Sequence, residues 1–247
     1  MIDAKDLRAQ HVKLFLYHVI LLVASLAAFG VMVYTQSMVA VVVLISVLAA
    51  AYIVLVIPKA DKFDNAVQQF CLNNTLGAQY DNILYDPNGG IVKEEAEESA
   101  LFQEALQYFS CDRSVAGHRE TPQGLEEMET GEIQYMPQED KETKMRRAIL
   151  AHLHCAGCHA RPLTVLEGKA EGTDITDAQK DILQTIRSMT EGNYSLTVRG
   201  ADAFLLLPGR SMRVKTSSIK PLKEADLQTN RLPELKLLGE LFRTRSV

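Results

Sequence analysis

Tryptophan is absent from this chain of 247 residues, and aromatic residues make up only 6% of it. A basic excess is absent too, because 31 acidic residues outnumber 26 basic ones and the formal net charge is −5. Domains that bind nucleic acid usually carry a basic stripe. The charge balance therefore argues against DNA or RNA as a partner.

Common catalytic signatures are also missing. The sequence holds no glycine-rich phosphate loop, no H-E-x-x-H motif of zinc proteases and no G-x-S-x-G nucleophile turn. Its glutamate-rich stretches lack the spacing of metal ligands. These absences favour a protein that is not an enzyme, and they point to no catalytic residue.

Charged side chains are absent from a long stretch near the N-terminus, since no Asp, Glu, Lys or Arg occurs between Lys13 and Lys59. Apolar runs at residues 14–34 and 38–57 fill most of this stretch. Each supplies the roughly 20 apolar residues that a helix needs to cross about 30 Å of hydrocarbon. The pattern predicts a transmembrane helical hairpin. A buried helix pair of a soluble protein is the alternative, but uncharged runs of this length are typical of membrane helices.

Basic residues flank the predicted hairpin. Lys5, Arg8 and Lys13 precede it, Lys59 and Lys62 follow it, and the turn between the two runs carries no charge. Positive flanks stay on the cytoplasmic side, so we expect both termini in the cytoplasm. The first run is too long for a signal peptide, and no A-x-A-like site follows it. We therefore expect no cleavage.

The chain after the hairpin is mostly polar, and its pattern predicts an α+β fold with antiparallel strands. We expect a cytoplasmic N-terminal segment (1–13), the transmembrane hairpin (14–57), an amphipathic connecting helix (58–77) and a cytoplasmic α+β domain (78–247). Pro58 is expected to end the second membrane helix, because proline removes a backbone donor.

Local patterns predict the elements of this domain. The acidic, glycine-containing stretch at 110–143 is expected to be a solvated loop, with short strands near Val115 and Ile133. Thr176 or Asp174 can cap a helix that stops at Gly192. Further strands are expected at 80–85, 145–155, 163–167, 194–199 and 203–207, and further helices at 94–109 and 233–243.

A C-x-x-C-H pattern runs from Cys155 to His159. In c-type cytochromes the two thiols bond to haem and the histidine ligates the iron, which makes Cys155, Cys158 and His159 candidate haem-binding residues. The expected cytoplasmic location argues against haem c, and so does the strand pattern before the motif. Moreover, Ala-Gly between the cysteines suits a tight turn that pairs the strands at 145–155 and 163–167. We therefore expect no cofactor, with haem c as an alternative.

Zinc is a second alternative for the same segment. Cys155, Cys158 and either His154 or His159 offer up to three metal ligands at knuckle spacing. A fourth ligand would have to come from a residue distant in sequence. A redox role for the thiols usually needs a helix N-terminus beside them, which a strand does not provide. Reduced structural cysteines, as expected in the cytosol, are the favoured interpretation.

The order of elements resembles a bacterial family that carries a domain of unknown function numbered thirty-one thirty-seven. The likeness includes the turn at residues 85–91 followed by Ser99-Ala-Leu101-Phe102, the strands at 147–155 and 162–167, and the helix, hairpin and helix from 177 to 242. The family tends to show a glycine soon after the arginine of its central strand, and Arg147-Ala148-Ile149 lacks it. The resemblance implies two membrane spans, a cytoplasmic α+β domain and a location in the bacterial inner membrane. It implies no activity, and it makes the segment from Cys155 to His159 a variable hairpin tip.

These observations favour a membrane-anchored, non-enzymatic adaptor or accessory subunit of a membrane or envelope protein complex. Residues 94–142 are strongly acidic, whereas the chain from Lys144 onward has more basic than acidic residues. Opposite charges on separate surfaces steer association. The expected partners are the lipid bilayer, other membrane or cytoplasmic proteins and a second copy of the chain, joined through Ala24, Ala28, Ser46 and Ala50. The alternatives are a c-type haem electron-transfer protein and a zinc domain that uses Cys155 and Cys158.

Overall fold

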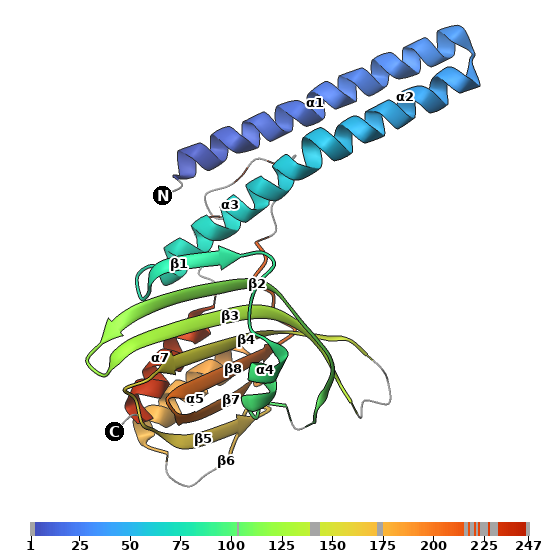
Figure 1. The fold of residues 1–247 in the computed structure, drawn as a ribbon. Helices are drawn as coiled ribbons and strands as arrows, with labels where there is room; N and C mark the ends of the chain where they lie inside the picture. The colour runs from blue at the N-terminus through green and yellow to red at the C-terminus, as the bar shows by residue number, and fades with distance from the viewer. Residues whose placement is uncertain are drawn as a thin grey trace. The chain divides into compact units, whose positions relative to one another are not determined.

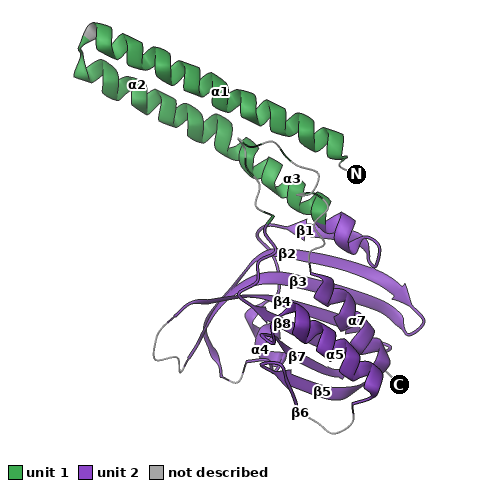
Figure 2. Ribbon diagram, turned by 180° about the vertical axis from the view of Figure 1, so that it is seen from behind, with its two compact units in different colours: residues 1–71, 214–229 green, residues 72–213, 230–247 purple. Residues whose placement is uncertain are grey.

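Two compact units make up the chain in the computed structural model, which describes residues 3–102, 104–138, 144–171, 175–214, 217, 220, 222, 227 and 232–245. Unit 1 comprises Met1–Cys71 and Val214–Thr229, and unit 2 comprises Leu72–Arg213 and Asn230–Val247 (Figure 2). The chain thus leaves unit 2 after Arg213 and returns to it at Asn230.

Unit 1 is built from long helices. Helix α1 (Ala4–Thr35) begins within the expected N-terminal segment, and α2 (Met38–Ala51) follows after a two-residue link. Ser37 caps α2 by accepting a hydrogen bond from the Ala40 amide at 3.4 Å. The prediction that Pro58 ends the second helix was wrong, because a π-helical turn (Tyr52–Val56) leads directly into α3 (Ile57–Leu76). In that turn the Ile57 amide bonds to the Tyr52 carbonyl, and this wider geometry accommodates the proline that follows.

The two apolar helices of unit 1 are long and apolar enough to cross a membrane. Only 6% of the most apolar stretch of each is buried inside the protein, whereas the core helix of a soluble protein would be mostly buried. Buried contacts in unit 1 gather instead at the polar ends of the helices, around Leu7, Phe63 and Val67. There Gln68 exchanges two hydrogen bonds with the backbone of Val214, at 3.0 and 3.1 Å.

Unit 2 is built on one antiparallel sheet with the strand order β1-β2-β3-β4-β8-β7-β5-β6 (Figure 1). This confirms the predicted α+β fold, in which antiparallel strands follow two apolar helices along the chain. The strands are β1 (Asp81–Asp86), β2 (Leu106–Thr121), β3 (Gly124–Pro137), β4 (Arg146–Cys155), β5 (Ala160–Leu166), β6 (Lys169–Glu171), β7 (Ser195–Gly200) and β8 (Asp202–Pro208).

Helices cover the two faces of this sheet unequally. Helices α5 (Asp177–Met189) and α7 (Pro233–Arg245) lie on one face (Figure 2), where Leu153, Cys155 and Leu205 join the larger core. Among the described residues, the other face carries only the short helix α4 (Lys93–Glu98) (Figure 1) and a smaller core that includes Leu150 and Phe204. In that part of the chain, some of the sheet on the α4 side has no helix above it.

Local signals placed several elements of unit 2 correctly. The expected cap Thr176 accepts a hydrogen bond from the Gln179 amide and forms a capping box with that residue, whereas Asp174 lies outside the described residues. Helix α7 buries its predicted apolar stripe, and β7 and β8 form the predicted hairpin. The buried stripe of α7 consists of Leu235, Leu238, Leu241 and Phe242.

The stretch from residue 94 to 143 differs from its prediction. The expected helix stops at Glu98, because the fully buried Ser99 donates its hydroxyl to the Ala96 carbonyl at 2.5 Å and Ala100 adopts a positive φ of 56°. The expected solvated loop is the hairpin of β2 and β3. At Gly131 of this hairpin, the neighbouring strand comes too close for a side chain, since an added Cβ would lie 2.2 Å from the Cys111 sulfur. Three of its acidic residues, Glu139, Asp140 and Glu142, lie outside the described residues.

The predicted pairing of β4 with β5 was also wrong. Strand β4 pairs with β3 on one side and β8 on the other, and β5 pairs with β6 and β7. The segment Cys155-Ala-Gly-Cys158 is a turn, with the Cys158 amide bonded to the Cys155 carbonyl at 2.9 Å, but it connects strands that are not neighbours. A strand buried on both faces finds its partners by long-range packing, which short sequence patterns do not encode.

Candidate functional site

Polar side chains gather on the α4 face of the sheet, where β4 meets β8. His152 and His154 alternate along β4 and therefore point to the same face. Asp202, the first residue of β8, lies directly across from His154 in the strand register. The three side chains come from two neighbouring central strands, whose ladder of hydrogen bonds fixes their separation.

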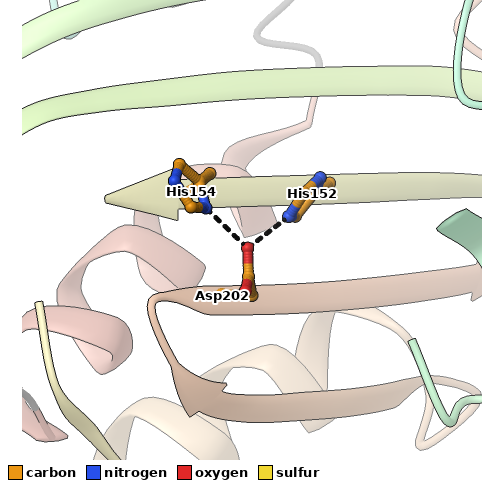
Figure 3. A group of neighbouring side chains, drawn as sticks. All are labelled: His152, His154 and Asp202. Atoms are coloured by element: carbon orange, nitrogen blue, oxygen red, sulfur yellow. Dashed lines mark hydrogen bonds and ion pairs between the residues drawn. The ribbon is translucent and has the colours of Figure 1, made fainter. Parts of the chain in front are cut away.

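One carboxylate oxygen connects the two imidazoles (Figure 3). Asp202 Oδ1 lies 2.9 Å from His152 Nε2 and 2.8 Å from His154 Nδ1. The His152 side chain is 16% exposed, whereas those of His154 and Asp202 are 39% and 36% exposed. The cluster is thus buried at His152 and open to solvent at His154 and Asp202.

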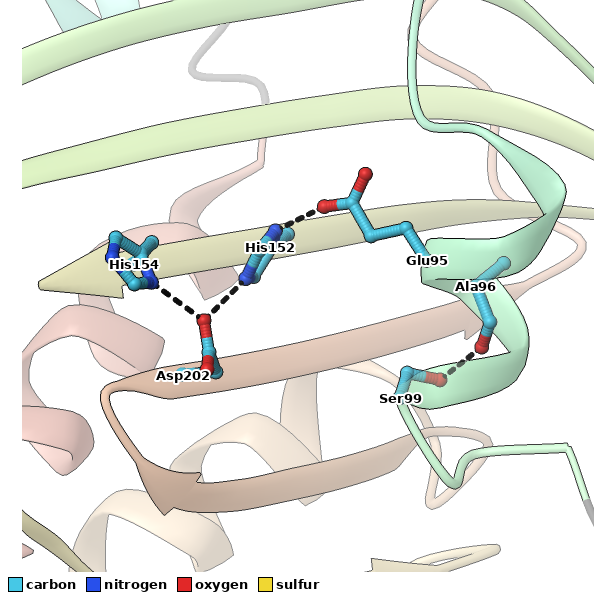
Figure 4. Close-up of polar contacts among 6 residues, drawn as sticks. All are labelled: Glu95, Ala96, Ser99, His152, His154 and Asp202. Atoms are coloured by element: carbon cyan, nitrogen blue, oxygen red, sulfur yellow. Dashed lines mark hydrogen bonds and ion pairs between the residues drawn. The ribbon is translucent and has the colours of Figure 1, made fainter. Parts of the chain in front are cut away.

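Helix α4 brings a second carboxylate to the same imidazole (Figure 4). Glu95 Oε1 contacts His152 Nδ1, so that each ring nitrogen of His152 faces a carboxylate. The helix is fixed at its other end by Ser99, and Arg199 on β7 donates to the Glu98 carbonyl. This one-turn helix thereby holds Glu95 in place.

The surroundings of His152 are both apolar and acidic. Its ring stacks on Phe204 with centroids 4.2 Å apart and planes 9° apart. Burial of the ring disfavours its charged form, but the hydrogen bonds to Glu95 and Asp202 outweigh burial and raise the pKa of His152. Burial also disfavours the charged form of Asp202, yet its hydrogen bonds to His154 and His152 lower the pKa of this carboxyl.

Glu129 adds a further carboxylate beside the cluster. It lies opposite His152 in the β3–β4 register. Burial, together with the nearby negative charge of Glu95, raises the pKa of Glu129. The three carboxyl groups of Glu95, Asp202 and Glu129 therefore surround the ring of His152 and attract a cation to this place.

A cleft of about 450 Å³ opens beside these side chains. His152, His154 and Glu95 line one part of it. The other lining residues belong to β1, β2 and β3; they are Asn82, Leu84, Ala116, Gly117, His118, Glu127, Met128 and Glu129. The histidine cluster is thus accessible from a polar cleft large enough for a small ligand.

The residues singled out in the sequence do not converge on one point. Cys155 and Cys158 are buried cysteines in the core beneath α5 and α7, and His154 points to the opposite face of β4. His159 is exposed in the turn. In the described part of the chain, three metal-ligating side chains come within 4.8 Å of one another only at His152, His154 and Asp202. Haem c and zinc at the cysteines stay predictions.

Sequence reasoning included His154 in a candidate metal set but missed three members of the cluster. The alternation His152-Leu-His154 on a predicted strand was an available signal, because it places both rings on one face. Asp202 gave no such signal, since its position depends on the pairing of β8 with β4. Glu95 was hidden for the same reason, because its contact with His152 is made across 57 residues of sequence.

A second polar cluster lies on the helix-covered face. Glu126 is 1% exposed and accepts hydrogen bonds from the Tyr80 hydroxyl at 3.1 Å and from Arg119 Nη2 at 2.5 Å. Arg243 of α7 approaches the same carboxylate to 3.9 Å. Burial and the Glu126 charge raise the pKa of Tyr80. This network connects α7 to β2 and β3, and its buried position is typical of a structural ion pair.

Comparison with models of protein families gave no match, and neither did comparisons with curated proteins and with solved structures. The resemblance to the domain of unknown function therefore stays a prediction, and the geometry carries the functional argument.

Proposed function

We propose that this protein is a membrane-anchored accessory subunit of a membrane protein complex. In this proposal α1 and α2 cross the bacterial inner membrane, and unit 2 lies on the cytoplasmic side together with both termini. The observation that carries it is the apolar surface of these helices, of which only 6% is buried within the protein. Lipid hydrocarbon is the environment in which such a surface is stable.

Several features support recognition of other proteins by unit 2. This unit has its own large core, so it can present a fixed surface to a partner. An anchor confines it near the membrane and raises its effective concentration for other membrane components. The small residues of the two apolar helices offer contact faces for further helices or for a second copy. In this role the protein binds and positions its partners and performs no chemistry of its own.

The test separates anchoring from recognition. One variant keeps the hairpin and lacks residues 59–247, and a second replaces residues 14–57 with an unrelated two-span hairpin. Each is purified from host membranes in mild detergent beside the intact protein, and the co-purifying proteins are compared. We expect the second variant to retain specific partners and the first to lose them.

Two outcomes would contradict the proposal. If the isolated hairpin retained every partner, recognition would lie in the membrane helices. If the intact chain were recovered in the soluble fraction without detergent, the anchor itself would be refuted. Both outcomes are read by mass spectrometry of matched preparations, with total expression as the control.

A further inference from the structure

The histidine cluster has the composition and spacing of a metal site. One ligand atom from each of His152, His154 and Asp202 lies within 4.8 Å of the other two. We propose that His152 Nε2, His154 Nδ1 and a carboxylate oxygen of Asp202 bind a divalent transition-metal ion, with zinc as the expected metal. This inference goes beyond the membrane-anchored role and does not depend on it.

Counting protons shows why a cation is needed here. A neutral imidazole has one N–H group, yet both ring nitrogens of His152 face carboxylates, Glu95 on one side and Asp202 on the other. One of these contacts is therefore unfavourable unless the ring carries a second proton or a metal ion lies between Nε2 and Asp202. His154 contacts the same oxygen through Nδ1 alone, and a neutral ring satisfies this contact by donating its one N–H group.

The geometry is close to what a metal ion requires. Zinc bonds of about 2.0–2.1 Å in a tetrahedral arrangement place ligand atoms about 3.3 Å apart. Asp202 Oδ1 is already 2.9 Å and 2.8 Å from the two imidazole nitrogens. Separating the side chains by about half an ångström admits the ion. Because all three residues lie on paired strands, the site is largely formed before binding.

Glu95 completes the pattern of a metal-bound histidine. Histidine ligands usually donate their second N–H to a carboxylate, which fixes the tautomer and the ring orientation. Glu95 faces Nδ1 of His152 and so leaves Nε2 as the metal-binding nitrogen. Stacking on Phe204 holds the ring plane from the side. His152 is thus oriented from two directions.

The chemistry of the donors selects the kind of ion. Two imidazoles and one carboxylate suit zinc and other late first-row divalent metals, whereas magnesium and calcium prefer oxygen ligands throughout. Glu129 and Glu127 lie opposite the two histidines on β3 and add negative charge to the site. Three protein ligands leave at least one coordination position open, and the adjoining cleft gives solvent and small ligands access to it.

The experiment uses the full chain, purified in mild detergent and stripped of metal with a chelator. Zn²⁺ binding is measured by calorimetry, and Co²⁺ serves as a spectroscopic probe of the ligands. The variants are Asp202→Asn, His154→Ala and Glu95→Gln, and a Cys155→Ser/Cys158→Ser double variant is the matched control for the cysteine site. Circular dichroism confirms that each variant is folded.

We expect one Zn²⁺ per chain. The spectrum of the Co²⁺ form should be that of an ion with nitrogen and oxygen ligands, without a thiolate charge-transfer band. Glu95→Gln should weaken binding about 10–100-fold, the usual effect of losing an orienting carboxylate. Asp202→Asn and His154→Ala should weaken it further, and the double cysteine variant should bind like the wild type. Mg²⁺ should not compete.

Two results would contradict the proposed metal site. One is the absence of Zn²⁺ binding by the wild type, which would leave a doubly protonated His152 as the explanation of the cluster. The other is binding that survives in Asp202→Asn and His154→Ala and is lost in the double cysteine variant. If His154→Ala proves unfolded, the Co²⁺ spectrum of the wild type decides, because a thiolate charge-transfer band would place the metal at the cysteines.

Discussion

His152 makes the stability of unit 2 depend on pH in a defined direction. Its pKa is raised above the ordinary value of 6.5, so the stabilisation is fully present below about pH 6.5 and is lost as the pH rises through the raised pKa. Asp202 acts in the opposite sense. Its pKa lies below the ordinary value of 3.8, so its contribution is present above that value and lost as the pH falls through the lowered pKa.

We therefore predict that the metal-free protein loses thermal stability as the pH rises from 6.5 through the raised pKa of His152. The measurement is thermal unfolding of the full chain in detergent and chelator, followed by circular dichroism from pH 5 to 9. His152→Gln should flatten this dependence, because glutamine does not titrate. His159→Gln, a change at an exposed histidine of the neighbouring turn, should leave it intact. An equally steep profile in His152→Gln would contradict the assignment.

At the scale of single elements, one buried carboxylate of the sheet helps to hold α7 in place, in addition to the apolar stripe of this helix. Glu126 is contacted by Tyr80, Arg119 and Arg243. Removing one partner of a buried ion pair leaves an uncompensated charge, so Glu126→Ala should destabilise the protein by about 3–5 kcal/mol. Glu127→Ala, at the neighbouring exposed position, should change stability by no more than about 0.5 kcal/mol.

Urea unfolding of the full chain in detergent measures both variants. An equal effect of the two substitutions would show that the Glu126 network stabilises the protein no more than an exposed glutamate does. Neither partner arginine was identifiable from the sequence, because Arg119 comes from β2 and Arg243 from α7. The acidic stretch around Glu126 had indicated a solvated loop instead.

The elements that sequence predicted best are those whose signals are local. The capping box at Thr176 is made by residues three positions apart, and the apolar stripe of α7 is made by residues within one short helix. Local patterns likewise predicted β4 as a strand, and the turn residues at 200–202 predicted the hairpin that contains β7. Residues 99–109 carried a misleading local signal, since apolar residues such as Leu106 and Phe109 fit a helix as well as a strand. Their pairing with β3 decides the outcome.

The histidine cluster was beyond sequence reasoning for a related reason. Two of its residues alternate on β4, but Glu95 and Asp202 arrive from a short helix and from another strand. Their convergence depends on the strand order, in which β8 lies beside β4 and β5 does not. The C-x-x-C-H pattern indicated a different site, because Cys155 lies on the opposite, buried face of β4.

At the scale of the whole molecule, we predict a topology with both ends on one side of the membrane. Lys5, Arg8 and Lys13 precede α1's apolar stretch, and Lys59 and Lys62 follow that of α2, which by the positive-inside rule places them in the cytoplasm. A C-terminal alkaline phosphatase fusion should be inactive and a C-terminal fluorescent protein should be bright. A reporter inserted at Gln36 should give the reverse pattern.

Active phosphatase at the C-terminus would contradict the predicted topology. It would place the C-x-x-C-H pattern outside the cytoplasm, where haem attachment occurs. Replacing Lys5, Arg8 and Lys13, the basic residues before the apolar stretch of α1, with glutamine tests the rule directly. This change should weaken the preference for the predicted orientation, whereas the same change at Lys236 and Arg243, both far from the hairpin in sequence, should not affect it.

The central position of β8 has a consequence for biogenesis. As the ribosome releases the chain, β2, β3 and β4 can pair in succession, but the second edge of β4 waits for β8, whose last residue is Pro208. Until then the Ala-Ile-Leu-Ala core of β4 presents unpaired backbone groups, the arrangement that recruits foreign strands. At roughly 5–20 residues per second this exposure lasts a few seconds, within which early capture by a chaperone would protect the nascent chain. Premature termination before β8 would make the exposure permanent.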